Sequence, residues 1–476
     1  MLNASPHRYS SSAIWMPAHS PLFMALTFLG CALAPQPAAA TTWPVGKCGD
    51  MAGKGGDTLR IAIGKAGTND TVDLSSLPVT CSTITLTGGQ IPIAVSNLTI
   101  QTPIDRPVTV DAAHAGRVFD HTGSGLLNVF GLVLANGSAG VGDSTGGCVR
   151  SSGSVLLQYA TVTGCEAAVG GGVIASNLSL IHSTISGCSI HYEVGGSTAG
   201  AAAWAWGSTL LSYATITDNY SQLSGAGLYS VGSITVNRSS ISGNTANFST
   251  GYFKDGPTPG FLGRCTALNT VAGTATITAS TIDGNLAADP GTLPGSLRSA
   301  VCAGAVTIDS STFSRNSGYA ITVRASASLR NTTISSNDAG LLFFSMSSLN
   351  VFSSTFAFNA SGLRLLPASG CSIWIESTIM ADNSIPISFC SQNTNIQNLV
   401  GSPVEAGLTP LAWRGGPTKT HGLMIGSPAI NAGSNPAAQS FDQRGTGYAR
   451  FVASAPDIGA YERQADDDEL FYGGFD

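Results

Sequence analysis

Short runs of alternating apolar and polar residues recur along this chain, and each run ends in the same way. The alternation is followed by a pair rich in Ser and Thr, then by one apolar residue and, three positions later, by Asn or Cys. Val155, Leu157, Val162 and Cys165 belong to one copy of this pattern. Because successive side chains of a strand point to opposite faces, alternation at every second residue predicts short β-strands.

The pattern recurs in nine copies, and successive copies lie 21 to 41 residues apart. The apolar residues that close the copies are Val162, Ile185, Ile216, Ile241, Ile282, Phe313, Ile334, Phe356 and Met380. The residues three positions later are Cys165, Cys188, Asn219, Asn244, Asn285, Asn316, Asn337, Asn359 and Asn383. A unit of about two dozen residues that repeats with insertions in one loop is the signature of a solenoid.

The composition of the unit indicates which solenoid forms. Leucine-rich repeats have a similar length, but they place Leu at several fixed sites and include a helical or turn segment, whereas every fixed site here suits a strand. Short parallel strands that hydrogen-bond from coil to coil, about 4.8 Å apart, form a parallel β-helix. Asn suits the closing position because it tolerates a left-handed backbone and can bond to the Asn of the next coil. We therefore predict an all-β parallel β-helix with an Asn ladder.

The first 40 residues are predicted to be a signal peptide. An apolar run over residues 21–34 is followed by the small residues Ala38, Ala39 and Ala40, which suit cleavage before Thr41. No later stretch reaches the roughly 18 apolar residues that a bilayer span needs, so no integral membrane span is expected. The chain is predicted to be exported.

Three zones and a tail follow the signal peptide. Residues 41–111 are predicted to form an N-terminal cap with the first strands, residues 112–391 the coils, and residues 392–463 a compact Gly- and Pro-rich module. In the first zone, residues 58–63 predict a short helix with Leu59 and Ile63 on one face, and such an element hides the unpaired edges at a solenoid end. The acidic and aromatic tail, residues 464–476, is either a disordered stub or a sorting signal with Phe471 and Phe475 as anchors.

Charged residues are scarce. They make up 10% of the chain, against about 25% in ordinary globular domains, and the net charge is -6. Because no basic stripe is available to hold phosphates, nucleic-acid binding is not expected. A surface of Ser, Thr, Asn and Gly is compatible with a hydrated polysaccharide as partner.

Nine cysteines remain after residue 40, and exported proteins usually oxidise them. Cys165 and Cys188 occupy the same position in adjacent coils, at a spacing that a disulfide accepts, so they form the favoured bridge. Cys148 is left without a partner. No Cys-x-x-Cys motif occurs and the histidines are scattered, so no metal or cofactor is expected. The other bridges favoured from proximity in the sequence are Cys48–Cys81, Cys265–Cys302 and Cys371–Cys390.

The region from Leu411 to Glu462 resembles the C-terminal module called choice-of-anchor Q, which occurs on exported bacterial β-helix proteins. The entry segment is similar to CSLREA-type N-terminal modules, although Cys48 lies ten residues before Thr58. The coils resemble polymorphic outer-membrane-protein-like repeats. These resemblances imply a right-handed parallel β-helix exported to a bacterial cell surface, and they supply neither an activity nor a ligand. The matching stretches of the module are residues 415–421, 427–433, 442–445 and 457–462.

Pectate lyases and polygalacturonases share the predicted fold, so catalysis has to be considered. Such enzymes need clustered acids, or calcium-binding acids beside a basic residue, on one face. The acids of the coils fall in different columns of the repeat, and no galacturonase motif is present. No catalytic residue is therefore assigned. These acids are Asp218, Asp283, Asp309 and Glu376.

Asp442, Arg444, Asp457 and Glu462 form the densest charged group in the sequence. One interpretation makes them an acid–base pair with an Arg that holds a substrate carboxylate. The other makes them an ion-pair network that fixes the terminal module to the last coil. We favour the structural interpretation, because Gly445 and Gly459 indicate tight turns rather than a pocket.

Planar side chains recur three positions before the closing apolar residue in four consecutive coils. They are Tyr159, His182, Tyr213 and Arg238, and Trp204 and Trp206 are expected in an adjoining insertion. Ring and guanidinium faces can bind sugars, so this column is a candidate glycan-binding strip. The alternative is ordinary stacking of like residues on a solenoid surface, worth about 0.2–1 kcal/mol per pair. Strict alternation would point the column inward, so its outward direction depends on the Ser/Thr bend.

Together these observations predict an exported, non-catalytic surface β-helix that functions in adhesion or glycan binding. The alternative function is a polysaccharide lyase or glycoside hydrolase of the same fold.

Overall fold

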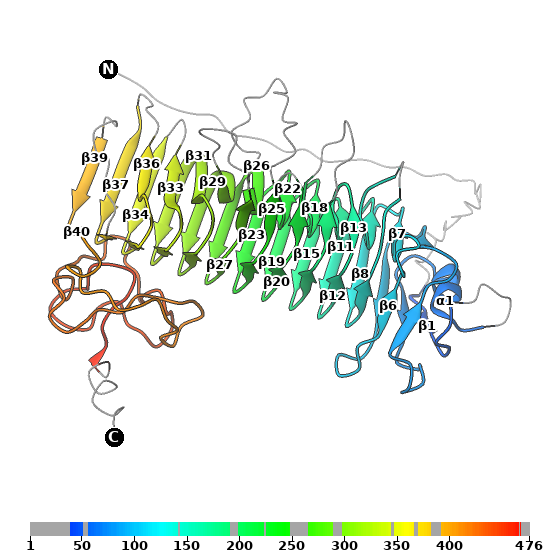
Figure 1. The fold of residues 1–476 in the computed structure, drawn as a ribbon. Helices are drawn as coiled ribbons and strands as arrows, with labels where there is room; N and C mark the ends of the chain where they lie inside the picture. Colours follow the sequence, from blue (N-terminus) through cyan, green and yellow to red (C-terminus); the bar gives the residue numbers. More distant parts are fainter. Residues whose placement is uncertain are drawn as a thin grey trace, which may run out of the picture. The chain divides into compact units, whose positions relative to one another are not determined.

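The protein is a right-handed parallel β-helix (Figure 1). The computed structural model describes residues 39–50, 56–140, 143–190, 199–222, 225–247, 265–288, 298–343, 347–365, 370–381, 392–465 and 467. Within these residues the chain forms one helix and three parallel sheets, A, B and C, with 22, 13 and five strands. Each sheet runs along the solenoid, because every strand pairs with its counterpart in the next coil.

Sheet A has two columns of strands, so most coils cross it twice. The first column contains β4 (Ile91–Ile93), β7 (Phe119–His121), β10 (Val149–Ser151), β14 (Val173–Ala175), β18 (Ala203–Ala205), β22 (Leu228–Ser230), β33 (Ala339–Phe343) and β36 (Leu363–Leu365). The second contains β1 (Thr42–Pro44), β2 (Asp70–Asp73), β5 (Leu98–Gln101), β8 (Leu126–Phe130), β11 (Ser154–Gln158), β15 (Leu178–Ile181), β19 (Thr209–Ser212), β23 (Ile234–Asn237), β34 (Ser348–Phe352), β37 (Ser372–Glu376) and β39 (Gln392–Ile396). Three long strands span both columns, namely β26 (Cys265–Thr278), β29 (Ser299–Asp309) and β31 (Tyr319–Arg330).

Sheet B follows sheet A along the coils, and sheet C follows sheet B in five of them. Sheet B contains β3 (Thr83–Thr85), β6 (Thr109–Asp111), β9 (Val133–Ala135), β12 (Thr161–Thr163), β16 (Thr184–Ser186), β20 (Thr215–Thr217), β24 (Ser240–Ser242), β27 (Thr281–Asp283), β30 (Thr312–Ser314), β32 (Thr333–Ser335), β35 (Thr355–Ala357), β38 (Ile379–Ala381) and β40 (Leu399–Gly401). Sheet C contains β13 (Glu166–Ala167), β17 (Ser189–Ile190), β21 (Tyr220–Ser221), β25 (Thr245–Asn247) and β28 (Leu286–Ala288).

The predicted apolar column fills the interior in register. All nine closing residues, from Val162 to Met380, have 0% exposure, and each is aligned with the next. The buried column also begins before the nine recognised copies, with Ile84, Val110 and Leu134, whereas Val400, which is aligned with Met380 at the other end, is 55% exposed. Each coil therefore buries the apolar face of its neighbours.

The Asn ladder forms inside the coils. From Asn219 to Asn359, each amide nitrogen donates to the amide oxygen of the next Asn at 2.9–3.0 Å. Of the two reasons given for Asn, the bond to the next coil is confirmed, but the left-handed backbone is wrong, because the left-handed residue is the one before it, such as Gly243 or Gly284. The ladder residue is selected instead for an amide that bonds to both neighbouring coils. Asn383 lies outside the described residues.

A short helix packs at the N-terminal end, as predicted. Helix α1 (Leu59–Lys65) buries Leu59 and Ile63 against the first strands. Arg60 fixes it, because its guanidinium pairs with Asp50 at 2.8 Å and donates to the carbonyl of Gln90 at 2.9 Å.

The coils continue past the predicted boundary at residue 391, because β39 and β40 form one more turn. In this last coil Asn393 and Asn395 occupy the positions of the buried Ile373 and Ile375. Polar residues thus replace the apolar core where the solenoid ends. This substitution disfavours association of the open end with other strands. The C-terminal module of the structure begins after Gly401.

The disulfide predicted between Cys165 and Cys188 is wrong. Cys165 is bonded to Cys148, with Cα atoms 5.5 Å apart, and Cys188 is a buried free thiol. In-register residues of parallel strands point the same way, whereas Cys148 and Cys165 belong to one coil and face each other across its interior. The bridges Cys48–Cys81 and Cys265–Cys302 form as predicted. Cys371 is disulfide-bonded, and Cys390 lies outside the described residues.

Candidate functional site

The column that contains Tyr159, His182, Tyr213 and Arg238 lies at the bend between sheets A and B. Every residue of this turn column has a left-handed backbone, with φ between 45° and 54°. This conformation interrupts the strand alternation and turns the side chain outward, as the bend was expected to do. The remaining members of the turn column are Ala279, Ser310, Asn331, Ser353 and Ser377.

Tyr159, His182 and Tyr213 form an aromatic stack on three consecutive coils. The ring centroids lie 4.9 and 4.7 Å apart, and the interplanar angles are 1° and 10°. Phe130 contacts the outer face of Tyr159 edge-on at 5.6 Å, and the Arg238 guanidinium lies 5.9 Å from the Tyr213 centroid. Neighbours therefore occupy the ring faces, and the polar ring edges face solvent. Tyr159 and Tyr213 are 42% and 48% exposed.

The structure does not bring the two tryptophans into this column. Trp204 lies on β18, in the first column of sheet A, and stacks on Tyr229 with centroids 4.1 Å apart. Trp206 contacts Trp204 edge-on at 5.4 Å and is 60% exposed. The four-residue strand β19 separates Trp206 from Tyr213. The tryptophans thus form a separate aromatic cluster within the coils rather than in an adjoining insertion.

Sheet B changes from a free to a covered surface halfway along the solenoid. The residues that flank the buried central position are half-buried in β12, β16, β20, β24 and β27. The corresponding residues are fully buried in β30, β32, β35 and β38. We call these two parts the free face and the covered face. The outward residues of the free face are Thr161, Thr163, Thr184, Ser186, Thr215, Thr217, Ser240, Ser242, Thr281 and Asp283.

The C-terminal module covers the second part of sheet B through side-chain hydrogen bonds. The Gln443 amide donates to Thr312 Oγ1 at 2.8 Å and accepts from Thr333 Oγ1 at 2.6 Å. His421 Nε2 lies 2.9 Å from Ser335 Oγ. Apolar residues of both parts, including Ile379 and Leu423, form a second core. The module therefore packs along the side of the last coils.

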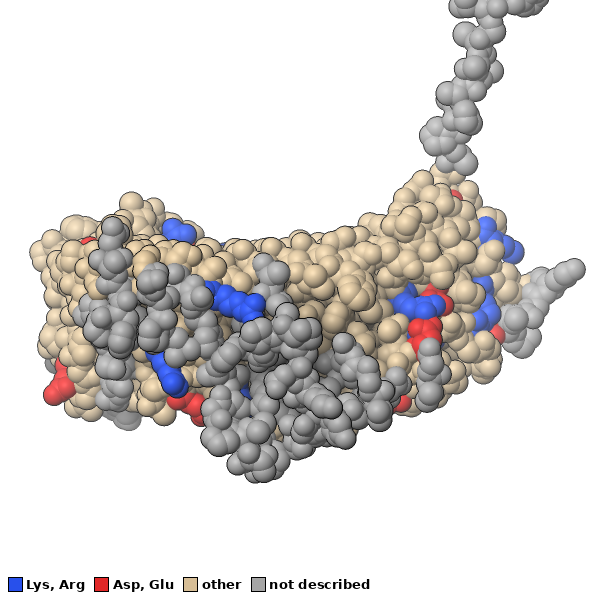
Figure 2. Space-filling view, turned by 90° about the horizontal axis from the view of Figure 1, so that it is seen from above, with Lys and Arg blue, Asp and Glu red and all other residues tan. Residues whose placement is uncertain are grey.

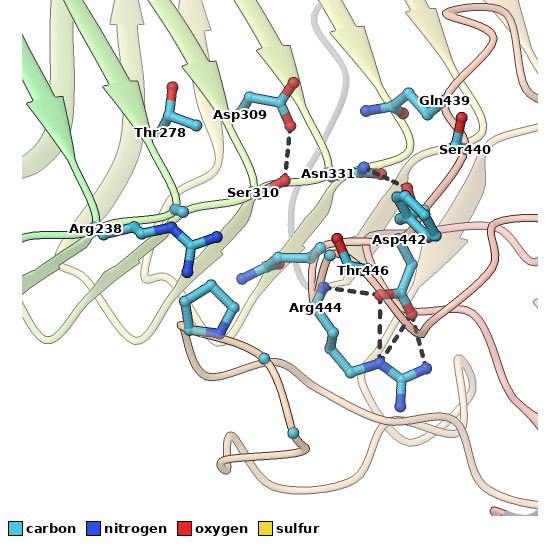
Figure 3. Close-up of a pocket in the computed structure, with 17 residues that line it drawn as sticks. Arg238, Thr278, Asp309, Ser310, Asn331, Gln439, Ser440, Asp442, Arg444 and Thr446 are labelled. Carbon is cyan, nitrogen blue, oxygen red and sulfur yellow. Dashed lines mark hydrogen bonds and ion pairs between the residues drawn. The ribbon is translucent and has the colours of Figure 1, made fainter.

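A pocket of about 770 Å³ lies where the turn column, continuing from Arg238, meets the module (Figure 3). Its wall on the coil side is formed by Arg238, Thr278, Ala279, Asp309, Ser310 and Asn331. The module contributes residues 415–417 and 439–446. The aromatic stack reaches this pocket through Arg238, which both contacts Tyr213 and lines the wall. The stack and the pocket are therefore parts of one continuous surface.

The charged group Asp442, Arg444, Asp457 and Glu462 is a buried network inside the module. Arg444 pairs with Asp442 at 2.8 Å, and its Cζ lies 3.9 Å from the ring centroids of Tyr448 and Tyr461. The Glu462 carboxylate accepts from the Asp457 N–H at 2.7 Å. All four side chains are at most 3% exposed. The side chains of this network contact residues of the module itself, whereas Gln443 and His421 make hydrogen bonds to the coils.

Burial shifts the ionisation of this network. Loss of hydration raises the pKa of Glu462 to about 8, and it also raises the pKa values of Asp442 and Asp457. Arg450 is fully buried beside these acids, and burial lowers its pKa. It donates to the carbonyls of Asp457 and Gly459, each at 2.7 Å. Asp457, Glu462 and Arg450 are at most 2% exposed, so they have no surface from which to reach a substrate.

The acids of the coils do not converge on one site. Asp283 pairs with Arg315, Asp309 lies 3.8 Å from Arg330, and Glu376 accepts from Ser434 of the module at 2.6 Å. Asp218 sits at the left-handed turn before the Asn ladder. No group of three His, Cys, Asp or Glu side chains suited to a metal occurs among the described residues. In the same part of the chain, no helix has the length and apolar character of a membrane span.

Sequence reasoning missed one ion-pair network near the first coils. Arg150 pairs with Asp120 of the neighbouring strand at 2.7 Å and also with Asp143, and Arg117 pairs with Asp143 at 3.0 Å. Two cations thus balance two anions. Elsewhere charged residues are sparse on the face in Figure 2. These residues precede the nine recognised copies or lie outside their fixed positions, which is why no pattern aligned them.

A family model and a solved structure are similar to this chain. The family model described as "Right handed beta helix region" matches residues 267–421. The crystal structure of pectate lyase Pel9A is similar, with a TM-score of 0.43 and 16% sequence identity over 89% of this chain and 96% of that chain. A search of curated proteins gives no significant match.

Proposed function

We propose that this protein is an exported, non-catalytic β-helix that binds a glycan along the free face of sheet B. The observation that carries the proposal is the boundary along sheet B where the outward residues change from half-buried on the free face to buried on the covered face. Five consecutive coils present Thr and Ser hydroxyls, the aromatic stack borders them, and a pocket lies at this boundary. A polysaccharide repeats its sugar hydroxyls along the chain, and the free face repeats its Thr and Ser hydroxyls from coil to coil. The two can therefore form hydrogen bonds at each coil.

The ring edges, rather than the ring faces, are the contact surface in this proposal. Sugar binding by ring stacking needs an open face, and the faces of Tyr159, His182 and Tyr213 are filled by neighbours. The outward hydroxyls of the two tyrosines and the imidazole of His182 can instead exchange hydrogen bonds with sugar hydroxyls. Trp204 and Trp206 form a separate cluster and are not part of the site.

Export and surface location belong to the same proposal. Three disulfide bridges among the described residues fit an oxidising compartment. The proposal also includes a signal peptide at residues 1–40 and a sorting role for residues 464–476. The resemblance of the C-terminal module to choice-of-anchor Q supports it. In this account the module fixes the last coils and limits the free face, and adhesion to a polysaccharide is the cellular role.

A glycan array probed with the mature protein tests binding, and a reducing-sugar and unsaturated-product assay on the bound glycans tests catalysis. Retention without product formation supports the proposal. Release of reducing ends or unsaturated products would identify a hydrolase or lyase instead, and absence of retention on every glycan would contradict the binding function.

Variants locate the binding surface. Thr184→Gln with Thr215→Gln adds bulk to the free face and should weaken retention at least tenfold, whereas Thr235→Gln, on the exposed face of β23, should not. Tyr159→Phe with Tyr213→Phe removes two edge hydroxyls but keeps the stack, and a loss of about two- to tenfold per hydroxyl is expected. Unchanged retention in both variants would place the ligand elsewhere.

A further inference from the structure

The pocket at the module edge contains one charge without an ionic partner. Arg238 forms no ion pair with any residue that the structure describes, and its guanidinium carbon lies 5.9 Å from the ring centroid of Tyr213. The other charged residues of the wall are balanced, since Asp442 pairs with Arg444 at 2.8 Å and Asp309 lies 3.8 Å from Arg330. Arg238 is therefore the cation of the pocket wall that has no ionic partner among the described residues.

Two buried amide oxygens in the same wall have no donor among the described residues. They are Oδ1 of Asn331 and Oε1 of Gln439. Asn331 is 3% exposed, and its Nδ2 donates to the Phe441 carbonyl at 2.9 Å, which fixes the amide. A buried acceptor left without a donor destabilises the protein unless a ligand or water supplies one. Figure 3 shows both amides across the pocket from Arg238.

The turn column is closed just beyond this pocket. Tyr213 is 48% exposed, whereas Asn331 is 3% exposed and Ser353 is fully buried beneath the module. A chain that lies along the column from Tyr159 therefore meets the module at the pocket. The position suits the end of a glycan chain rather than its middle.

We infer that the pocket binds the terminal sugar of the glycan and that this sugar carries a carboxylate. The inference rests on the proposed glycan binding and adds the class of ligand. The Arg238 guanidinium can donate two parallel N–H groups to a carboxylate. The oxygens of Asn331 and Gln439 accept from the hydroxyls of the same sugar. A neutral sugar would leave the guanidinium without its counter-ion.

The test compares matched glycans on one array. Each set contains a neutral oligosaccharide, the same oligosaccharide with a terminal uronic or sialic acid, and one in which the acidic sugar is internal; sulfated chain ends form a separate set. Wild type, Arg238→Gln, Arg238→Lys and the control Arg364→Gln are compared. Arg364 is an exposed arginine on β36, in sheet A.

The terminal carboxylate should strengthen wild-type binding about tenfold or more, because hydrogen bonds between charged partners are stronger than neutral ones. Arg238→Gln should abolish this preference without lowering the melting temperature, Arg238→Lys should retain part of it, and Arg364→Gln should retain all of it. Equal binding of neutral and acidic ends would overturn this inference but leave glycan binding intact. A preference for internal acids or for sulfate would also overturn it. Absence of binding to every glycan would instead contradict the proposed function.

Discussion

The free and covered faces of sheet B are built from the same repeat but meet different surroundings. In β16 the residues around Ile185 are Thr184 and Ser186, and in β32 the residues around Ile334 are Thr333 and Ser335. The first pair is half-buried and the second pair is fully buried. The repeat therefore determines which residues form the core, whereas a module more than 50 residues further along the chain decides which outward residues stay available.

The covered face has a second core, and the free face has none. Towards the C-terminus the outward residues become apolar, as Ala357, Ile379 and Ala381 show, and they pack against Leu408 and Leu423 of the module. On the free face the outward positions remain Thr and Ser up to β24. Disruption of the module should therefore affect the two faces very differently.

The largest expected effect is the loss of the module in Asp442→Ala. This change leaves Arg444 buried without its partner, and breaking a buried ion pair costs about 3–5 kcal/mol. Hydrogen exchange should then increase in β30, β32, β35 and β38, while β12 to β24 keep their protection. Asp283→Ala, which removes a partly exposed ion pair from the free face, should cost less than about 1 kcal/mol. Equal loss of protection in both halves would mean that the module stabilises the whole solenoid.

Gln443→Ala should have the next largest effect. The side chain is fully buried and links Thr312 and Thr333 to the module. Its removal leaves buried hydroxyls unsatisfied, so we expect a loss of about 2–3 kcal/mol in the unfolding free energy of the module. Gln464→Ala, which changes a more exposed glutamine directly after the module, is the matched control. Urea denaturation followed by near-UV circular dichroism measures both, and equal midpoints would contradict the bridging role of Gln443.

The pH dependence of the module sharpens the comparison further. The pKa of Glu462 is raised from 4.5 to about 8, so folding favours the neutral carboxyl. Its contribution to stability is fully present below pH 4.5 and is lost as the pH rises through about 8. The raised pKa values of Asp442 and Asp457 also make the module less stable as the pH rises. Burial lowers the pKa of His421 from 6.5, so this histidine is neutral above pH 6.5 and does not contribute to the change.

Calorimetric melting between pH 6.5 and about 8 should therefore show the module transition moving to lower temperature, while the coil transition stays constant. Glu462→Gln should reduce this slope. A module transition that rises with pH, or a variant with the wild-type slope, would contradict the assignment.

The smallest expected effect concerns the aromatic stack. Tyr213→Ala removes two ring contacts and should cost about 1 kcal/mol. Tyr213→Gly should cost less, because glycine adopts the observed φ of 52° without strain. Ala279→Gly, at the equivalent bend where no ring stacks, should leave stability unchanged or raise it. If Tyr213→Gly is the more damaging change, the left-handed bend is not the source of strain.

The interior of the solenoid could be predicted from the sequence because it depends on local alternation. Val162 and Met380 belong to one column, and nothing far along the chain changes which way they point. The Cys148–Cys165 bridge could not be predicted in the same way. Cys148 lies outside the recognised copy, so its position across the coil from Cys165 appears only when the coil closes.

The candidate site was only half predictable for the same reason. The planar residues of the turn column follow the repeat, so Tyr159 and Tyr213 could be identified. The pocket depends on residues 439–446, which fold back onto coils more than 100 residues earlier. The sequence contained one sign of the covered face. Outward positions that are Thr or Ser in earlier coils become Ala in β35 and Ile and Ala in β38. That change indicates a covered surface, although not what covers it.

The most direct test is a hydrogen-exchange footprint of the mature protein with and without its best-bound array glycan. Binding at the site described above should protect backbone amides around β12, β16, β20, β24 and β27 and at residues 439–446, and should leave the first column of sheet A unchanged. Protection confined to β18 and β22, around Trp204 and Tyr229, would contradict the assignment of the free face as the binding surface.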